Sequence, residues 1–266
     1  MLGRFIHKTL GVPYKLAVPI DVRRKTEDAT VLFLHGIAAT SSTWRELVGE
    51  LKKDPAFDAV RLTSVDLLGF GKSPAPGWLG YTVNDYLRAL RRTTRSLKIT
   101  GPIYIVGHSM GSLLATDYAA RYGDASALLL ISPPFMRPEE QRVPADKLYA
   151  MALDNLKKAA QTNSGKKAGK VVEKFTSFEV KYTSTPAFRR SMDQVVLKGH
   201  AWQEAKKLEV PVVLVHGRFD SVVSRSNLVK LAKLPHISLA ESANGHSISQ
   251  RRRPFVVKQL KKLIAH

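Results

Sequence analysis

A glycine-flanked serine carries the clearest chemical signature in this sequence. Gly107-His108-Ser109-Met110-Gly111 follows the apolar run Ile103–Val106 and precedes a stretch with helical periodicity. This G-x-S-x-G pattern, between a strand and a helix, is typical of a tight turn that holds a serine hydroxyl above a sheet. The flanking glycines are needed because the backbone of the turn passes close to its neighbours. Ser109 is therefore the candidate nucleophile.

The elements that would position this serine are short apolar, β-branched runs alternating with amphipathic stretches. Unbroken runs of this kind suit strands buried on both faces, as in a parallel sheet. Such runs occur at Val31–Leu34, Val60–Val65, Ile103–Val106, Ala127–Ile131 and Val212–Val215, with a last strand expected at His236–Ala240. Helical patterns cover Val83–Leu97, Leu113–Tyr122 and Pro254–Ile264. This alternation predicts the α/β class with right-handed crossovers.

The alternation stops between Pro133 and Val210. The sequence there reads as helical segments, including Pro138–Met151 and Pro186–Leu197, joined by polar loops. A stretch of this length is too long for a simple connection between two core strands. We therefore expect an accessory subdomain over residues 133–209, inserted into one core domain formed by residues 1–132 and 210–266.

Five motifs together resemble the α/β-hydrolase superfamily of esterases, thioesterases and C–C hydrolases. They are His35-Gly36, Asp66-Leu67-Leu68-Gly69-Phe70-Gly71-Lys72-Ser73, the turn at Ser109, Gly217-Arg218-Phe219-Asp220 and Gly245-His246. They occur in the family's order with family-like spacing, and the resemblance covers nearly the whole chain apart from the insertion. It implies the α/β-hydrolase fold, a mostly parallel twisted sheet flanked by helices, with residues 133–209 as a helical cap.

A serine hydroxyl needs a neighbouring base because it is a poor nucleophile at neutral pH. Of the eight histidines, His246 lies after the expected last strand and before the final helix, where the superfamily carries its base. The resemblance therefore implies that His246 is the base. His35 is expected to make a structural hydrogen bond, and the His108 side chain is expected to point away from the nucleophile.

The base in turn needs a carboxylate that orients it and stabilises its charged form. Asp220 follows the Val212–Val215 run, so it would lie at the same edge of the sheet as Ser109. The chain order Ser109, Asp220, His246 is the order expected of this fold. Two rival carboxylates are Glu241, interpreted as a surface loop residue, and Asp66, interpreted as a structural acid in its turn.

The resemblance also implies an oxyanion hole and an acyl-enzyme mechanism. Two backbone N–H groups suffice to stabilise a tetrahedral oxyanion. The residues implied are Met110, after the nucleophile, and Ile37, after His35-Gly36. Ser109 would attack with His246 as base, and water activated by His246 would release the acyl group. No cofactor or metal is required, and a carboxylesterase or thioesterase is the favoured activity.

The insertion would set the substrate, a small molecule that carries an acyl group. Its candidate pocket or cap-core residues are Phe135, Met136, Leu148, Met151, Leu153 and Phe178. A C–C bond hydrolase of the meta-cleavage type is an alternative, although no tryptophan follows His246 closely. A non-catalytic ligand-binding protein on the same fold is another. Trp44 is expected to pack in the core beneath the oxyanion loop.

The charge balance of the chain is strongly basic. Forty-two Lys and Arg residues against 22 Asp and Glu residues give a formal charge of +20. The basic residues gather in Arg88–Lys98, Gln161–Lys181 and Arg251–Lys262. We interpret them as solvated helix faces rather than as a nucleic-acid site. This charge also suits an anionic substrate or an acidic carrier protein.

The remaining composition bears on chemistry and location. The chain has no cysteine, which excludes disulfides, thiolate nucleophiles and cysteine-based metal sites. No stretch approaches the roughly 20 apolar residues of a membrane span, and no signal peptide is evident. A cytoplasmic protein is the resulting expectation, and nothing in the sequence bears on its oligomeric state.

Overall fold

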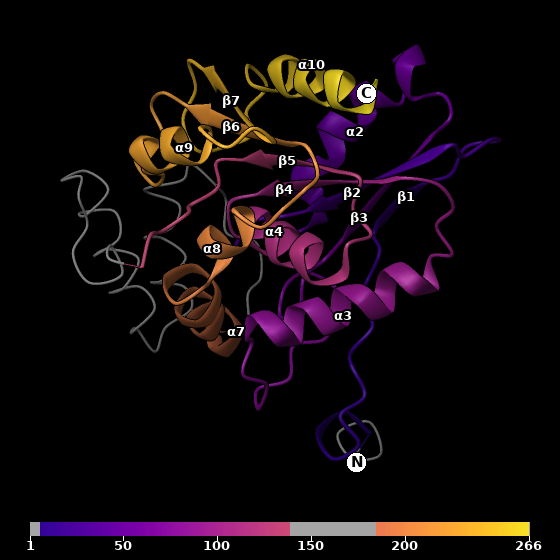
Figure 1. The fold of residues 1–266 in the computed structure, drawn as a ribbon. Helices are drawn as coiled ribbons and strands as arrows, with labels where there is room; N and C mark the ends of the chain where they lie inside the picture. Colours follow the sequence, from indigo (N-terminus) through magenta and orange to yellow (C-terminus); the bar gives the residue numbers. More distant parts are fainter. Residues whose placement is uncertain (1–5, 139–184, 266) are drawn as a thin grey trace.

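A single seven-stranded sheet organises the chain (Figure 1). The computed structural model describes residues 6–138 and 185–265. The strand order is β1-β3-β2-β4-β5-β6-β7, with β1 antiparallel to β3 and every other pair parallel. The predicted α/β class with a mostly parallel sheet is confirmed.

Six of the strands lie where the sequence predicts them, five from the apolar runs and β7 from the expected last strand at His236–Ala240. They are β2 Ala29–Leu34, β3 Val60–Val65, β4 Ile103–His108, β5 Ala127–Ile131, β6 Val212–Gly217 and β7 Ile237–Ser242. Every residue of β2, β3 and β5 is buried, as expected of strands covered on both faces. Parallel pairing aligns Leu34 with Gly107 and His108 with Ile131. The carboxyl ends of β2, β4 and β5 therefore meet beside Ser109.

The first strand, β1 (Ile20–Val22), is too short to produce an apolar run and was not predicted. It is held to β3 by a fork of hydrogen bonds from a buried arginine. Nε of Arg61 lies 2.7 Å from Oδ1 of Asp21, and Nη2 lies 2.8 Å from Oδ2. Nη1 of Arg61 also donates to the carbonyl of Leu97 at 2.9 Å. Arg61 thus connects three segments that are distant in sequence.

Helices cover the two faces of the sheet in separate layers (Figure 1). The helices α3, α4, α8 and α9 contribute to one apolar core, and α2 and α10 contribute to the other. Their bounds, with those of the short 3-10 helices, are η1 Ser41–Trp44, α2 Arg45–Leu51, η2 Pro55–Phe57, α3 Val83–Ser96, α4 Met110–Tyr122, α8 Ala201–Ala205, α9 Arg225–Leu231 and α10 Arg253–Ile264. None of the described helices has the length and apolar character needed to cross a membrane.

A capping box explains where α3 begins, and the packing of its apolar side chains explains why the helix is stable. The Thr82 side chain accepts a hydrogen bond from the Asp85 N–H, and the Asp85 side chain accepts one from the Thr82 N–H. This reciprocal capping box satisfies two otherwise unpaired donors of the first turn. Tyr86, Leu87 and Leu90 then face the core, while the arginines of the helix lie on other sides.

The insertion is described only at its two ends. The helix α7 (Thr185–Ser191) continues into a π-helical turn, η3 (Met192–Leu197), close to the predicted segment Pro186–Leu197. Phe188, Met192 and Val195 pack into the core on the α4 side of the sheet. The predicted helix Pro138–Met151 and the candidate pocket residues Leu148, Met151, Leu153 and Phe178 lie outside the described residues. The assignment of residues 133–209 as a cap stays a prediction.

A buried acid in α4 makes stability depend on pH. Asp117 is 5% exposed, and its Oδ2 has no hydrogen-bond partner among the described residues. Burial, with a contribution from the charge of Glu204, raises the pKa of Asp117 from 3.8 to about 7. The folded state therefore binds more protons than the unfolded state between these values, so this group lowers stability as pH rises through that window.

We expect Asp117→Asn to stabilise the protein at pH 8 by about 2 kcal/mol, and to have much less effect at pH 4. The neutral amide avoids the cost of ionising a buried carboxyl. Urea unfolding at the two pH values measures this, with the exposed Asp58→Asn as a control that changes little at either. An equal gain at both pH values would argue against a raised pKa of Asp117.

Candidate active site

Ser109 lies in a strained turn between β4 and α4. It has φ 52° and ψ −121°. A residue with a side chain rarely adopts such backbone angles. Its N–H donates to the carbonyl of Ile131 at 2.9 Å, which holds the turn against the end of β5. Because Ser109 also stands at the N-cap of α4, the geometry matches the tight strand–turn–helix arrangement that the motif predicts.

The glycines of the motif permit close backbone packing. A Cβ at Gly111 would lie 2.2 Å from the carbonyl oxygen of Leu34. A Cβ at Gly107 would lie 2.6 Å from the carbonyl oxygen of Gly111. Both distances are far shorter than van der Waals contact, so any larger residue would push α4 away from the sheet. The motif therefore sets how closely the helix approaches β2.

The His35-Gly36 loop lies directly beside Ser109. A Cβ at Gly36 would be 3.1 Å from the Ser109 Cβ. Ala38, two residues later, has φ 58°, and the Ala39 N–H donates to the Gly36 carbonyl, so the chain turns sharply here. Ile37 lies within this turn. Met110 is the first residue of α4, where N–H groups lack intrahelical partners. The two predicted oxyanion donors thus belong to adjoining segments.

The buried His35 side chain holds this loop through hydrogen bonds. Nδ1 donates to the Gly36 carbonyl at 2.7 Å, and Nε2 accepts from the Leu67 N–H at 2.9 Å. Burial lowers the pKa of His35 from 6.5 to about 4, so the ring stays neutral, as one donor and one acceptor nitrogen require. The expected structural hydrogen bond is present. Trp44, with no exposed surface, packs in the core as predicted.

Both carboxylate oxygens of Asp66 accept hydrogen bonds from backbone N–H groups. Its Oδ1 accepts from the Ser41 N–H at 2.7 Å, and its Oδ2 accepts from the Lys72 N–H at 2.8 Å. These hydrogen bonds tie the turn after β3 to the segment that enters η1. The geometry agrees with the interpretation of Asp66 as a structural acid.

Asp220 and His246 lie side by side in the loops after β6 and β7. Nδ1 of His246 is 2.9 Å from Oδ2 and 3.0 Å from Oδ1 of Asp220. The His246 and Asp220 side chains are 2% and 0% exposed respectively. The Phe219 N–H donates to the Asn244 carbonyl at 3.0 Å and holds the two loops together. The carboxylate therefore fixes the imidazole through Nδ1 and leaves Nε2 as the nitrogen that could act as a base.

The surroundings of Asp220 keep it ionised. Burial alone would raise its pKa, but the adjacent His246, a hydrogen bond from Ser132 and the Val222 N–H together hold the pKa below its ordinary value. The Val222 N–H lies 3.0 Å from Oδ1. An ionised carboxylate can accept from the imidazole and stabilise it when it becomes charged.

His108 connects the Ser109 turn to the His246 loop. Its Nε2 donates to the His246 carbonyl at 2.9 Å, and the two rings meet edge to face with centroids 5.1 Å apart. The sequence predicts only that this side chain points away from Ser109, so its contact with the His246 loop is new. No hydrogen bond joins the Ser109 hydroxyl to His246 in the described part of the chain. Catalytic hydrogen bonds are often long in unliganded sites and tighten with substrate.

Arg252 lies beneath the same site and was missed by sequence reasoning. It has no exposed surface, although it belongs to a basic run that was interpreted as a solvated helix face. Its Nη1 lies 2.9 Å from Ser132 Oγ, and also 2.9 Å from the Gly245 carbonyl and 3.1 Å from the His246 carbonyl. Its Nη2 donates to the Val215 carbonyl at 3.1 Å. The solvated-face interpretation is wrong for this residue.

The environment of Arg252 makes it a support for the histidine loop. Burial lowers its pKa to about 10, and the charge of Asp220 opposes that shift. The guanidinium remains protonated at neutral pH. It contacts Ser132, a hydrogen-bond partner of Asp220, and the backbone carbonyl of His246. These contacts join the start of α10 to the ends of β5 and β6 and to the histidine loop.

We expect Arg252→Lys to lower the free energy of unfolding by about 2 kcal/mol or more, because one ammonium cannot reach all these oxygens and leaves buried carbonyls unpaired. Arg251→Lys, at the exposed neighbouring position, should stay within about 0.5 kcal/mol of wild type. Urea unfolding measures both. Equal stability of the two variants would show that the buried guanidinium contributes nothing specific.

Glu241, the alternative candidate for the catalytic acid, forms an ion pair with Arg225. Arg225 donates to its two carboxylate oxygens at 2.8 and 2.9 Å. The residue lies within β7, so its interpretation as a loop residue is wrong, although its ion pair does lie near the surface. Among residues 6–138 and 185–265, no group of three or more acidic or histidine side chains is arranged to hold a metal ion.

The family profile described as "alpha/beta hydrolase fold" matches residues 29–173, which is more than half of the chain. The chain belongs to the α/β hydrolase fold family. The turn at Ser109 and the His35-Gly36 loop both fall inside the matched segment. Asp220 and His246 lie beyond it, after the last two strands of the sheet.

Individual relatives match shorter segments. "Probable lysophospholipase BODYGUARD 3" of Arabidopsis thaliana is 35% identical over 122 residues, which cover 46% of this chain and 24% of that protein. "Coelenterazine h 2-monooxygenase" of Renilla reniformis is 34% identical over 104 residues, or 39% of this chain and 32% of that protein. The chain thus matches about a quarter to a third of the length of these relatives.

A solved structure, "Esterase (EaEST) from Exiguobacterium antarcticum", superposes with a TM-score of 0.69. The match covers 94% of this chain and 96% of that one at 19% identity. Likeness at this level of identity concerns the fold. The two sequence relatives are named for different reactions, a lysophospholipase and a monooxygenase.

Proposed function

We propose that this chain is a serine hydrolase that cleaves carboxylic esters or thioesters through an acyl-enzyme on Ser109. The observation that carries the proposal is the buried Asp220–His246 pair, held against the Ser109 turn by the contact from His108. An ionised acid, an imidazole with one nitrogen committed and a serine in a strained turn form the arrangement that activates an oxygen nucleophile.

Each step then has a residue assigned to it. His246 removes the Ser109 proton as the hydroxyl attacks the acyl carbon, and Asp220 stabilises the imidazolium that forms. The N–H groups of Ile37 and Met110 donate to the tetrahedral oxyanion. His246 returns the proton to the leaving group, which departs and leaves the acyl-enzyme. A water molecule deprotonated by His246 then attacks the ester carbonyl and frees the acid product and Ser109.

A substrate panel tests this proposal. Purified protein would be assayed with p-nitrophenyl esters of increasing acyl length, an acyl thioester and a lysophospholipid, the last because of the name of the Arabidopsis relative. We expect turnover of at least one activated ester, together with covalent labelling by a fluorophosphonate probe. Assays at several salt concentrations would show whether anionic esters lose rate more than neutral ones, as the +20 charge predicts for an anionic substrate.

The same panel separates the alternatives. Cleavage of a vinylogous diketone without ester turnover would favour a C–C hydrolase. Saturable ligand binding with no turnover and no probe labelling would favour a non-catalytic protein on this fold and would contradict the proposal.

A further inference from the structure

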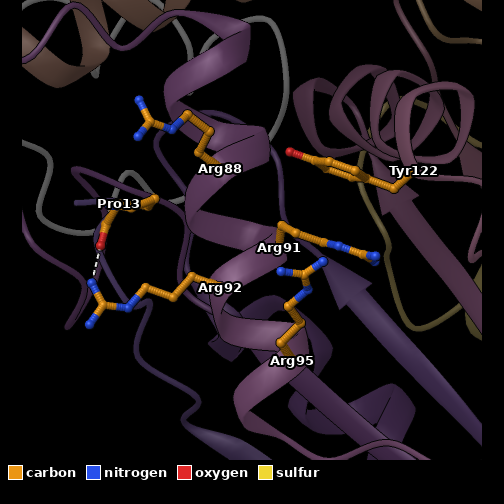
Figure 2. Close-up of a pocket in the computed structure, with 6 residues that line it drawn as sticks. All are labelled: Pro13, Arg88, Arg91, Arg92, Arg95 and Tyr122. Atoms are coloured by element: carbon orange, nitrogen blue, oxygen red, sulfur yellow. Dashed lines mark hydrogen bonds between the residues drawn. The ribbon is translucent and has the colours of Figure 1, made fainter. Parts of the chain in front are cut away.

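A concave site lies between α3, the end of α4 and the segment at Pro13, away from the Ser109 turn. A pocket of about 330 Å³ is lined by Pro13, Arg88, Arg91, Arg92, Arg95 and Tyr122 (Figure 2). The arginines follow the spacing i, i+3, i+4, i+7, which places side chains on one side of a helix. This volume is at the lower end of the range for small-molecule sites, about 300–1,000 Å³.

Several of these guanidinium groups are already positioned by the chain. Arg88 donates to the Gly11 carbonyl and Arg92 to the Pro13 carbonyl, the second contact being drawn in Figure 2. Arg91 pairs with Asp124, and its guanidinium carbon lies 4.8 Å from the centre of the Tyr122 ring. An arginine has five N–H donors, so these contacts leave others available.

The positive charge of the pocket is poorly compensated. Among the described residues, Arg88, Arg92 and Arg95 form no ion pair, and the carboxylate paired with Arg91 is that of Asp124. Like charges at i, i+4 destabilise a helix. Arg95 is in the last turn of α3, where the helix dipole favours a cation, but Arg88 is not. An anionic occupant would offset the repulsion.

The position of the pocket separates it from the proposed catalytic site. Ser109 caps the N-terminus of α4, and Tyr122 is the last residue of that helix. The helix is 13 residues long. At a rise of about 1.5 Å per residue, its two ends are about 20 Å apart. A ligand in the pocket would not contact Ser109, and the site does not depend on the proposed hydrolase activity.

We propose that this pocket binds a phosphate group, as a phosphomonoester or a diphosphate. The planar guanidinium fork matches phosphate oxygens with two parallel hydrogen bonds, and four such forks line this pocket. A compact pocket suits one such group, whereas a nucleic-acid duplex needs a row of phosphate contacts along an extended surface. The group would belong either to a soluble organic phosphate or to a lipid headgroup.

Titration calorimetry with pyrophosphate tests the site in the full chain. We expect saturable binding that weakens at least about tenfold in the triple variant R88Q/R92Q/R95Q, because three charged hydrogen-bond donors are lost. The charge-matched control K53Q/K258Q/K262Q, at exposed positions on the α2 and α10 side, should bind within about twofold of wild type. Equal losses in both variants would reduce the effect to net charge and overturn the proposal.

A single variant guards against a folding defect in the triple one. Arg95→Gln removes a side chain that has no hydrogen bond or ion pair among the described residues, so the thermal midpoint without ligand should not change. Its affinity for pyrophosphate should nevertheless fall several-fold. Unchanged affinity for pyrophosphate in Arg95→Gln would contradict the proposal. So would a folded wild-type protein that does not bind pyrophosphate, even if it binds duplex DNA.

Vesicle sedimentation distinguishes the two sources of the phosphate. If a lipid headgroup is the ligand, phosphatidylcholine vesicles containing phosphatidic acid should retain wild type and the control but release the triple variant. Phosphatidylcholine alone should retain none of them. Pyrophosphate binding without vesicle retention would assign the pocket to a soluble phosphate.

Discussion

Ser109→Ala is expected to reduce the hydrolysis of p-nitrophenyl butyrate by about 10⁴-fold or more and to abolish fluorophosphonate labelling. The hydroxyl is the only group of this side chain that the proposed chemistry uses. The backbone of the turn, which donates to Ile131 and starts α4, should tolerate the smaller side chain. Thermal unfolding should therefore change little while activity is lost.

Ser112→Ala provides the matched control for that experiment. Ser112 lies further along α4, and its hydroxyl donates to the Ile131 carbonyl at 3.2 Å. Removing this hydroxyl therefore deletes a structural hydrogen bond and leaves the proposed nucleophile in place. This variant should keep probe labelling and most of the activity. Labelling retained in Ser109→Ala would contradict the assignment of the nucleophile.

Asp220→Asn is expected to lower kcat by about 10³- to 10⁴-fold with little change in KM. The carboxylate accepts from Nδ1 of His246 through both oxygens. An amide would favour the imidazole tautomer in which Nε2 carries the proton, and would no longer stabilise the imidazolium. Steady-state kinetics on the same ester measure the effect.

Glu241→Gln separates the two carboxylates. Its side chain pairs with Arg225, and an exposed ion pair contributes little to stability, about 0–1 kcal/mol. Activity should stay within about twofold of wild type, because the proposed mechanism gives this residue no role. A severe loss in Glu241→Gln together with a mild one in Asp220→Asn would exchange the proposed roles of the two acids.

Local patterns in the sequence predicted the parts of the fold that local physics controls. Unbroken apolar runs predicted five strands because a strand covered on both faces has to be apolar along its length. The G-x-S-x-G motif predicted the turn at Ser109 because only glycines fit where α4 packs against β4 and the end of β2. In contrast, β1 escaped prediction, since so short a strand, held by Arg61, has no periodicity to detect.

Some residues of the candidate site could be predicted from the sequence, and others could not. Resemblance of short motifs pointed to Asp220 and His246, and the structure places them in contact. The same resemblance says nothing of Arg252, which looks like any other member of a basic run. It also says nothing of the His108 contact, because the residue between Gly107 and Ser109 is not specified by the motif.

The sequence by itself determined the α/β class, most of the strands and the candidate nucleophile, because apolar periodicity and a glycine-flanked motif are patterns of residues close in the chain. Tertiary structure alone decided which charged residues are buried and which gather in a pocket. Arg252 and Arg95 are the same residue type in similar basic surroundings. One is enclosed by carbonyls of β6 and of the histidine loop, and the other is exposed at the end of a helix. The environment of a charge depends on segments distant in sequence, which only the fold brings together.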